Sequence, residues 1–168
     1  EGGLIVRYDS GETDTVPSGE VPYPVLYYKL DKADLNKTGT TKEAMTRLAD
    51  VLGCSLRSYT DGRKRTGALG YLGCCFASMK KFIDVNIDGE PDLSKYDRVI
   101  IGMPVWVEGP CIMGKSLLMK FGKQFNNEVY YVVTQQGTSD YTKKIYALDE
   151  YIGRPSNGHI SLRTKDND

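Results

Sequence analysis

Val99–Met103, with the sequence VIIGM, is the most strand-like stretch of the chain and the one on which the fold prediction rests. Tyr96–Arg98 lead into it and Pro104 ends it. A short apolar run that ends at a proline is typical of a strand buried on both faces of a parallel sheet. Trp106, the only tryptophan, follows two residues later, so we expect it where this strand leaves the sheet.

Outward from this strand, strand patterns alternate with helical ones. Further strands are predicted at residues 25–28, 54–59, 128–134 and 158–162, and helices at residues 38–52, 68–82, 111–125 and 140–151. Gly53 stands where a C-cap glycine belongs. Strands separated by helices of this length favour an α/β fold, a three-layer αβα sandwich with a five-stranded parallel sheet. Right-handed crossovers then bring the carboxyl ends of all strands to one edge, where open α/β sheets bind ligands.

The length of 168 residues fits one domain with a sizeable core. Residues 1–24, which are rich in Gly, Pro and acidic residues, are interpreted as an N-terminal arm with a short strand at Leu4–Tyr8, and residues 25–168 as the domain itself. Basic and acidic residues both total 22, so nothing in the net charge points to nucleic acid. Arg63–Arg65 is the only tight basic run; a solvated loop and a partner-docking patch are both open interpretations.

Several function classes find no support in the composition. No stretch approaches the roughly 18 apolar residues of a membrane span, and no signal peptide is visible, so we expect a cytoplasmic protein without membrane contact. Cys54, Cys74, Cys75 and Cys111 have no CxxC spacing and are interpreted as buried thiols rather than disulfides or metal ligands. His159 is the only histidine, and no nucleophile elbow accompanies it, so hydrolase chemistry is not expected.

The loop Asn36-Lys37-Thr38-Gly39-Thr40-Thr41 runs from the first domain strand into a helix. Backbone N–H groups at a helix N-terminus are unsatisfied, and the helix dipole favours an anion there. Gly39 allows close backbone approach, and three threonine hydroxyls add donors. A phosphate monoester suits this loop, although an ordinary threonine N-cap with a turn glycine explains it equally well. The loop lacks the Lys-Ser/Thr ending of a P-loop.

Two further loops leave strand ends at the same predicted edge. Residues 103–110 carry Trp106 on a proline-bounded segment, which suits stacking on a planar ring, while the alternative is a core tryptophan that covers the sheet edge. Residues 134–138 (TQQGT) offer amide and backbone groups for the polar edge of a heterocycle, but a polar loop needs no ligand to explain it. Together the three loops describe a crevice with a phosphate cradle, an aromatic wall and a polar end.

On these segments, together with Arg63–Leu72 (RKRTGALGYL), the sequence resembles the flavodoxin family, in particular short flavodoxin-like FMN-binding proteins. The resemblance covers residues 25–162 and implies strand order 2-1-3-4-5 with FMN at the switch point between the first and third strands, a rule for which flavodoxin itself is the standard example. The residues that it implies for FMN binding are Asn36, Lys37, Thr38, Gly39, Thr40 and Thr41 at the phosphate, Pro104, Val105 and Trp106 beside the isoalloxazine ring, and Gln135, Gln136, Gly137 and Thr138 at its pyrimidine edge.

The sequence departs from the family pattern in three ways. Lys29–Leu35 is inserted before the phosphate loop, Ser161–Asp168 is too short and polar for the usual final helix, and the net charge is neutral rather than acidic. The expected function is electron transfer through bound FMN to a redox partner protein or a small-molecule acceptor. Reduction of a quinone or similar molecule, a cofactor-free binding module and a homodimer stay open.

Overall fold

The structure is a computed structural model that describes residues 4–7, 13–16, 24–29, 40–63, 67–87, 96–126 and 128–163. The predicted phosphate-loop residues Asn36, Lys37, Thr38 and Gly39, and most of the inserted stretch before them, lie outside the described residues. The strands are β1 (Leu4–Arg7), β2 (Thr13–Val16), β3 (Pro24–Lys29), β4 (Ser55–Thr60), β5 (Asn86–Ile87), β6 (Arg98–Trp106), β7 (Gly109–Pro110), β8 (Glu128–Gln135) and β9 (Gly158–Arg163). The helices are α1 (Thr40–Leu52), α2 (Gly67–Ser78), α3 (Ile112–Phe121), the 3₁₀ turn η2 (Gly122–Gln124), α4 (Thr142–Tyr146) and α5 (Asp149–Ile152).

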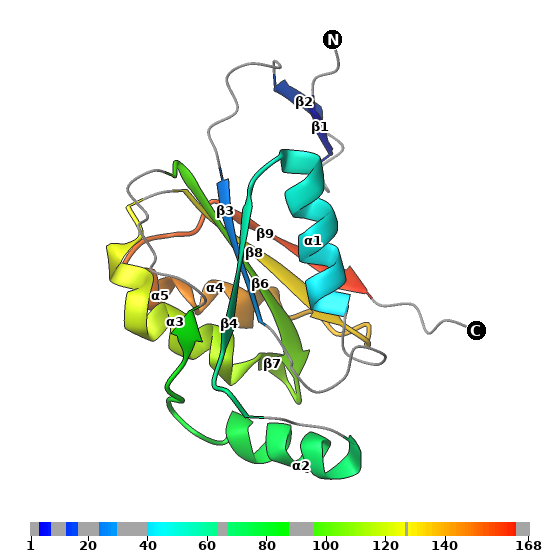
Figure 1. The fold of residues 1–168 in the computed structure, drawn as a ribbon, viewed down its shortest axis with the longest axis vertical. Helices are drawn as coiled ribbons and strands as arrows, with labels where there is room; N and C mark the ends of the chain where they lie inside the picture. Colours follow the sequence, from blue (N-terminus) through cyan, green and yellow to red (C-terminus); the bar gives the residue numbers. More distant parts are fainter. Residues whose placement is uncertain are drawn as a thin grey trace, which may run out of the picture.

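One sheet of seven strands organises the molecule (Figure 1). Its order is β5-β4-β3-β6-β8-β9, with β7 paired to β6. The pairs β4–β3, β3–β6, β6–β8 and β8–β9 are parallel, whereas β5 and β7 each pair antiparallel. The predicted α/β fold with a mostly parallel sheet is therefore confirmed. The two antiparallel strands were not predicted, because two residues are too few to show a strand pattern.

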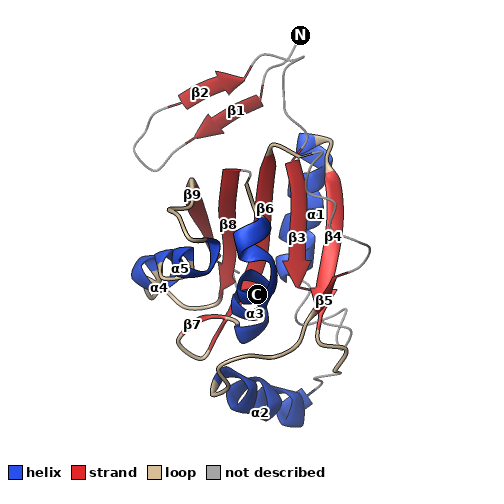
Figure 2. Cartoon of the chain, turned by 90° about the vertical axis from the view of Figure 1, so that its left-hand side faces the viewer, coloured by secondary structure: helices blue, strands red, loops and turns tan. Residues whose placement is uncertain are grey.

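Helices flank the sheet on both faces (Figure 2). α1 lies against one face, and α3, α4 and α5 lie against the other, so the two faces are called the α1 face and the α3 face below. α2 departs from the layers: the three views place it beyond the carboxyl edge of the sheet. It also ends at Ser78, earlier than the predicted residue 82.

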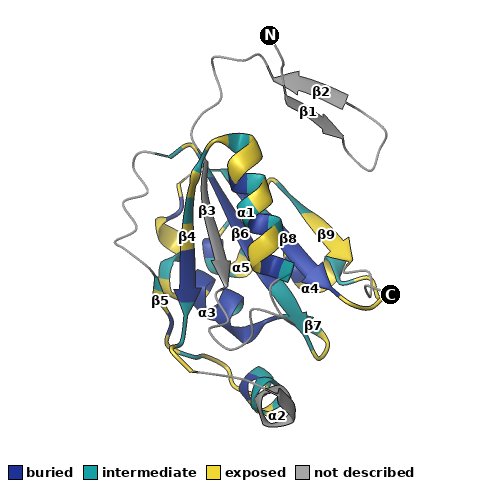
Figure 3. Cartoon of the chain, turned by 45° about the vertical axis from the view of Figure 1, so that its right-hand side comes forward, coloured by how far each residue is buried: buried dark blue, intermediate teal, exposed yellow. Residues whose placement is uncertain are grey.

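The apolar core is divided unevenly between the two faces. Figure 3 shows β6 and β8 buried and β9 largely exposed. Among the residues whose burial is described, the cluster on the α3 face has sixteen buried members, most of them on β6, β8 and α3. Counted in the same way, the cluster on the α1 face has four, namely Met45, Ala49, Ile100 and Val132.

Two buried tyrosines tie the α3 face together through their hydroxyl groups. Tyr59 on β4 donates to the carbonyl oxygen of Gly102 over 3.0 Å, and Tyr131 on β8 donates to Oδ1 of Asp149 over 3.1 Å. Burial raises the pKa of both tyrosines above the ordinary value. Both hydroxyls therefore stay protonated and serve as hydrogen-bond donors that link the sheet internally and to α5.

The helix ends follow local sequence signals in part. Gly53 has φ +60° directly after α1, which confirms the predicted C-cap glycine. The single helix predicted over residues 140–151 is wrong: the chain forms α4 and α5 with a turn between them. Ile145 of α4, Leu148 of the turn and Ile152 of α5 are all buried, so residues at the spacing of one helix reach the core from two short helices and the turn between them.

The N-terminal part contributes a separate ribbon. β1 and β2 pair antiparallel in a two-stranded sheet of their own, with Leu4 opposite Val16. The short strand expected near Leu4 is thus confirmed, while the division into an arm and a domain stays a prediction. In the described part of the chain, no helix has the length and apolar character that crossing a membrane requires.

Candidate functional site

The ends of β6 and β8 and the start of α1 meet at the carboxyl edge of the sheet. Pro104 at the end of β6 stands in register with Thr134 near the end of β8. Thr41, in the first turn of α1, shares a hydrogen bond of 2.5 Å between its Oγ1 and that of Thr134. Both threonines are only 4% exposed. Residues from all three predicted loops are therefore brought together, although 93 residues separate Thr41 from Thr134.

The N-terminus of α1 keeps the properties that an anion requires. Thr40 and Thr41 are its first two residues, and backbone N–H groups at this position have no partner within the helix. The acidic residue of the first turn, Glu43, forms an ion pair with Arg47 one turn later, so its charge is balanced on the helix surface. A helix of 13 residues also carries the full dipole of an ordinary helix.

Trp106 lies on a β-hairpin rather than on the irregular proline-bounded loop that the sequence predicted. Val105 pairs with Pro110 and Trp106 with Gly109, which leaves Val107 and Glu108 as the two residues of the turn. Cys111 N–H closes the base of the hairpin by donating to the carbonyl oxygen of Pro104 over 2.9 Å. Trp106 is half-buried and packs against the larger core cluster, so it covers the sheet edge in part, while its stacking on a planar ring stays a prediction.

Val107 is the conformational outlier of the described residues. Its φ is +59°, and no other described residue except glycine has a positive φ. A two-residue hairpin with positive φ at its first turn position normally has glycine there. A β-branched residue in this conformation costs of order 1–3 kcal/mol, which the surrounding structure must offset. The turn next to Trp106 is therefore held in place against its local preference.

The third loop begins buried and ends exposed. Gln135, the last residue of β8, is 7% exposed, whereas Gln136, Gly137 and Thr138 are exposed. The carbonyl oxygen of Thr138 accepts a hydrogen bond from Nη2 of Arg163 on β9, at 3.5 Å. Gln135 is thus buried at the end of β8, and the residues after it are open to solvent.

The structure therefore brings some of the predicted site residues together, while others, residues 36–39, lie outside the described part of the chain. Thr41, Pro104 and Thr134 are joined by register and a hydrogen bond, and Trp106 and Gln135 end the same two strands. Their assignment as cofactor ligands stays a prediction. Thr134 was named only as part of its loop, because its side-chain bond to Thr41 depends on strand pairing and leaves no trace in the sequence.

Residues outside this edge have structural partners. The four cysteines form no disulfide with one another; Cys111 is buried as predicted, but the prediction is wrong for Cys54, Cys74 and Cys75, which are only partly buried. Sγ of Cys111 caps α3 by accepting from Gly114 N–H at 3.4 Å. Burial raises the pKa of Cys54 to about 11, which makes it a poor nucleophile at neutral pH. His159 lies 3.4 Å from Oγ1 of Thr142 and packs edge-on against Tyr146. Among the described residues, no three His, Cys, Asp or Glu side chains gather as metal ligands would.

Lys144 on α4 is a contact of the Trp106 hairpin that the sequence did not reveal. Its Nζ donates a hydrogen bond to the carbonyl oxygen of Glu108 and lies 3.6 Å from Oε2 of the same residue. The two residues are 36 positions apart in the sequence. No motif marks Lys144, because one lysine on the surface of a short helix is a common feature.

Comparison with known proteins places the fold. No protein-family model and no curated protein sequence matches the chain. A flavoprotein from Lactobacillus acidophilus NCFM, crystallised in complex with FMN, matches with a TM-score of 0.68 and 21% identity, over 84% of this chain and 93% of that one. A protein from Bacteroides eggerthii DSM 20697 that is described as a flavoprotein matches with a TM-score of 0.68 and 16% identity, over 87% and 91%. The chain thus has a flavodoxin-like fold, as its sequence predicted.

Proposed function

We propose that this protein binds FMN at the carboxyl edge of its sheet and exchanges electrons through the bound flavin. The observation that carries the proposal is the hydrogen bond between Thr41 and Thr134, since it joins the N-terminus of α1 to the strand end beside Trp106. This arrangement supports a phosphate at one end of the site and a planar ring at the other. The fold likeness to a flavoprotein that was crystallised with FMN supports the same assignment.

The donor set fits FMN in chemical type. The N-terminus of α1 and the threonines of its loop suit the phosphate, Pro104, Val105 and Trp106 suit the flanks of the isoalloxazine ring, and residues 135–138 suit its polar edge. When bound, the flavin supplies the redox chemistry. The protein's own residues bind the phosphate, orient the ring and limit access of water to it.

The finer fold assignment belongs to the same proposal. We assign a flavodoxin-like core with strand order 2-1-3-4-5, in which β4, β3, β6, β8 and β9 are the five family strands. The parallel pairings of these strands support it. The cofactor then lies at the switch point between β3 and β6, and we propose a cytoplasmic protein that carries electrons to a partner protein or a small acceptor.

A second candidate function is reduction of a small apolar acceptor such as a quinone. The exposed side chains of α2 and the turn after it favour this candidate: Phe76 is 66% and Met79 81% exposed, and α2 lies beyond the same edge as Trp106 (Figure 3). An exposed apolar surface beside the candidate site suits an apolar acceptor better than a charged protein. The neutral net charge agrees with this preference.

An FMN titration of the full chain tests the proposal. We expect quenching of flavin fluorescence with saturation at one FMN per chain, and a yellow complex. Trp106→Ala should weaken binding by tenfold or more, because aromatic stacking on a heterocycle is worth about 1–3 kcal/mol. Tyr151→Ala is the matched control, since Tyr151 is also a partly buried aromatic packed against the larger cluster but lies on α5. Absence of saturable binding by the unmodified protein would contradict the proposal.

The two candidate acceptors are separated by reoxidation of the FMN-loaded, chemically reduced protein. Fast reoxidation by a soluble quinone with slow reoxidation by a small redox protein supports the second candidate. The reverse order of rates supports protein-to-protein electron transfer. Leu72→Ser and Phe76→Ser on α2 should slow only the quinone reaction, because both side chains are exposed and neither belongs to the core clusters.

A further inference from the structure

The turn at the tip of the Trp106 hairpin needs an external support. Val107 holds a positive φ that its side chain disfavours, and a hairpin whose turn is unfavourable relaxes unless other contacts oppose it. The base of the hairpin is fixed by the pairing of β7 with β6. That pairing ends at Trp106 and Gly109, so Val107 and Glu108 themselves form no strand pair within the hairpin.

Lys144 supplies the contact at the tip. Its Nζ donates to the main-chain carbonyl oxygen of Glu108, within the turn itself. Its stem runs beside Gly109, since a Cβ placed on Gly109 would lie 3.2 Å from Cδ of Lys144. The hydrogen bond is therefore made to the backbone of the turn. Lys144 Nζ also lies 3.6 Å from Oε2 of Glu108, which adds a solvent-exposed ion pair.

The helix that carries Lys144 is itself firmly attached to the sheet. Ile145 is 1% exposed and belongs to the larger core cluster. At the start of the helix, Oδ1 of Asp140 accepts a hydrogen bond from the N–H of Thr142 over 2.8 Å. Tyr146 packs edge-on against His159 of β9, with ring centroids 5.0 Å apart. A support mounted on α4 is thus fixed relative to the strands that end at the candidate site.

We propose that Lys144 is a positioning residue of the flavin site, which holds the Val107–Glu108 turn and thereby sets the orientation of Trp106. This inference rests on the proposed FMN function for its consequence, while the restraint on the hairpin is a property of the protein without cofactor. Lys144 contacts the turn through its backbone and lies on a helix that carries none of the predicted FMN-binding residues. Its role is therefore to reduce the conformations that the Trp106 hairpin adopts before the ring binds.

The test compares Lys144→Met with Lys143→Met on the full chain. Methionine keeps most of the stem beside Gly109 and removes the charge and the donor. Lys143 is the neighbouring exposed lysine on the same helix and is the matched control. We expect Lys144→Met to weaken FMN binding by up to about tenfold, because binding must then order the released turn, and Lys143→Met to stay within about twofold. Lys144→Arg, which keeps a cationic donor, should recover most of the affinity.

Trp106 fluorescence gives a readout that does not depend on the cofactor. Because Trp106 is the only tryptophan, its quenching by acrylamide reports on this hairpin alone. We expect stronger quenching in FMN-free Lys144→Met than in the unmodified protein, with equal melting temperatures. Val107→Gly should reverse this effect in the Lys144→Met background, since glycine accepts the positive φ without strain.

Two outcomes would overturn the inference: unchanged acrylamide quenching in Lys144→Met, or increased quenching that Lys143→Met reproduces. Failure of the unmodified protein to bind FMN is a different result. It would contradict the proposed function, while the quenching comparison would still decide whether Lys144 holds the turn.

Discussion

The two faces of the sheet differ in how many buried apolar residues are described on each. On the α3 face, which three helices cover, Ile101 and Tyr131 of the sheet and Leu117 of α3 are fully buried. On the α1 face a single helix covers the centre, and beyond it Ile160 on β9 is 54% exposed. Ile160 stands in register with buried Val132, which identifies it as part of the same face. In the part of the chain that the structure describes, the α3 face thus holds the larger core, and no described helix covers the α1 face along β9.

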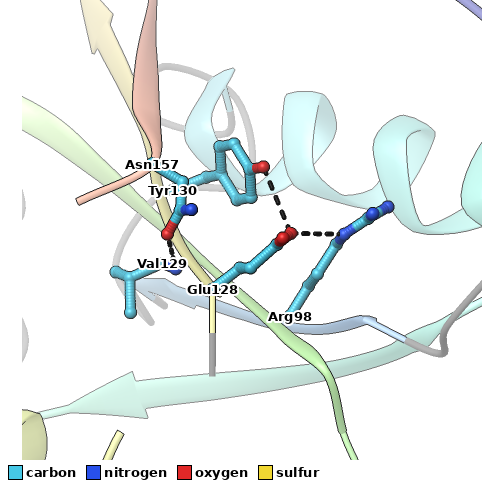
Figure 4. Close-up of polar contacts among 5 residues, drawn as sticks. All are labelled: Arg98, Glu128, Val129, Tyr130 and Asn157. Carbon is cyan, nitrogen blue, oxygen red and sulfur yellow. Dashed lines mark hydrogen bonds and ion pairs between the residues drawn. The ribbon is translucent and has the colours of Figure 1, made fainter. Parts of the chain in front are cut away.

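Polar contacts occupy the amino end of the open face. Glu128 on β8 stands opposite Arg98 on β6, and its Oε2 accepts hydrogen bonds from Arg98 Nε at 2.7 Å and from the Tyr130 hydroxyl at 3.2 Å (Figure 4). Asn157 fixes the start of β9 by accepting from Val129 N–H at 3.0 Å. The charged pair is partly exposed, so it contributes at most about 1 kcal/mol. Polar side chains thus line this end of the face, whereas Ile160 and Leu162 on β9 are apolar side chains that stay exposed.

The largest expected effect comes from the α3 face. Leu117→Ala should lower the free energy of unfolding by about 2–5 kcal/mol, because the leucine is 0% exposed and its removal leaves a cavity in the larger cluster. Met119→Ala on the same helix is the control: it is 42% exposed and should cost far less. Urea unfolding of both variants gives the comparison. Similar losses would mean that α3 does not carry the core.

An intermediate effect is expected where α1 meets the sheet. A Cβ at Gly102 would lie 2.5 Å from Cγ of Met45, so Gly102→Ala forces the methionine to move and should cost about 1–3 kcal/mol. Met45→Ala creates the space that the new methyl group needs. In a double-mutant cycle measured by urea unfolding, the two losses should therefore sum to more than the loss in the double variant. Additive losses would show that α1 approaches β6 less closely than described.

Local sequence patterns predicted the central elements well because local forces determine them. The apolar run Val99–Met103 forms the middle of β6, and the glycine after α1 takes the left-handed conformation that glycine tolerates. The pattern over residues 140–151 misled, since buried residues at helical spacing do not show where a helix breaks. β7 escaped prediction for another reason: its two residues, Gly109 and Pro110, carry no strand signal at all.

The candidate site was predictable in its parts but not in its connections. The meeting of Thr41, Pro104 and Thr134 at one edge agrees with the expectation that the strand ends lie together there. The bond between Thr41 and Thr134 and the contact between Lys144 and Glu108 join residues 93 and 36 positions apart. Such contacts depend on register and on side-chain direction in three dimensions. The positive φ of Val107 could not be predicted, because the Val107–Glu108 turn lacks the glycine that normally marks such a turn.

The smallest effect, and the one that bears most directly on the open face, is expected at β9. Ile160→Thr should change the free energy of unfolding by less than about 0.5 kcal/mol, since its side chain is half-exposed and threonine keeps the β-branched shape that strands favour. Val132→Thr is the control in the neighbouring strand and the same register, where a valine that is 4% exposed would bury a hydroxyl and cost about 1–3 kcal/mol. Urea unfolding at two protein concentrations separates the cases. An Ile160→Thr loss as large as that of Val132→Thr would mean that β9 is covered, and a loss that grows with protein concentration would identify a second copy of the chain as the cover.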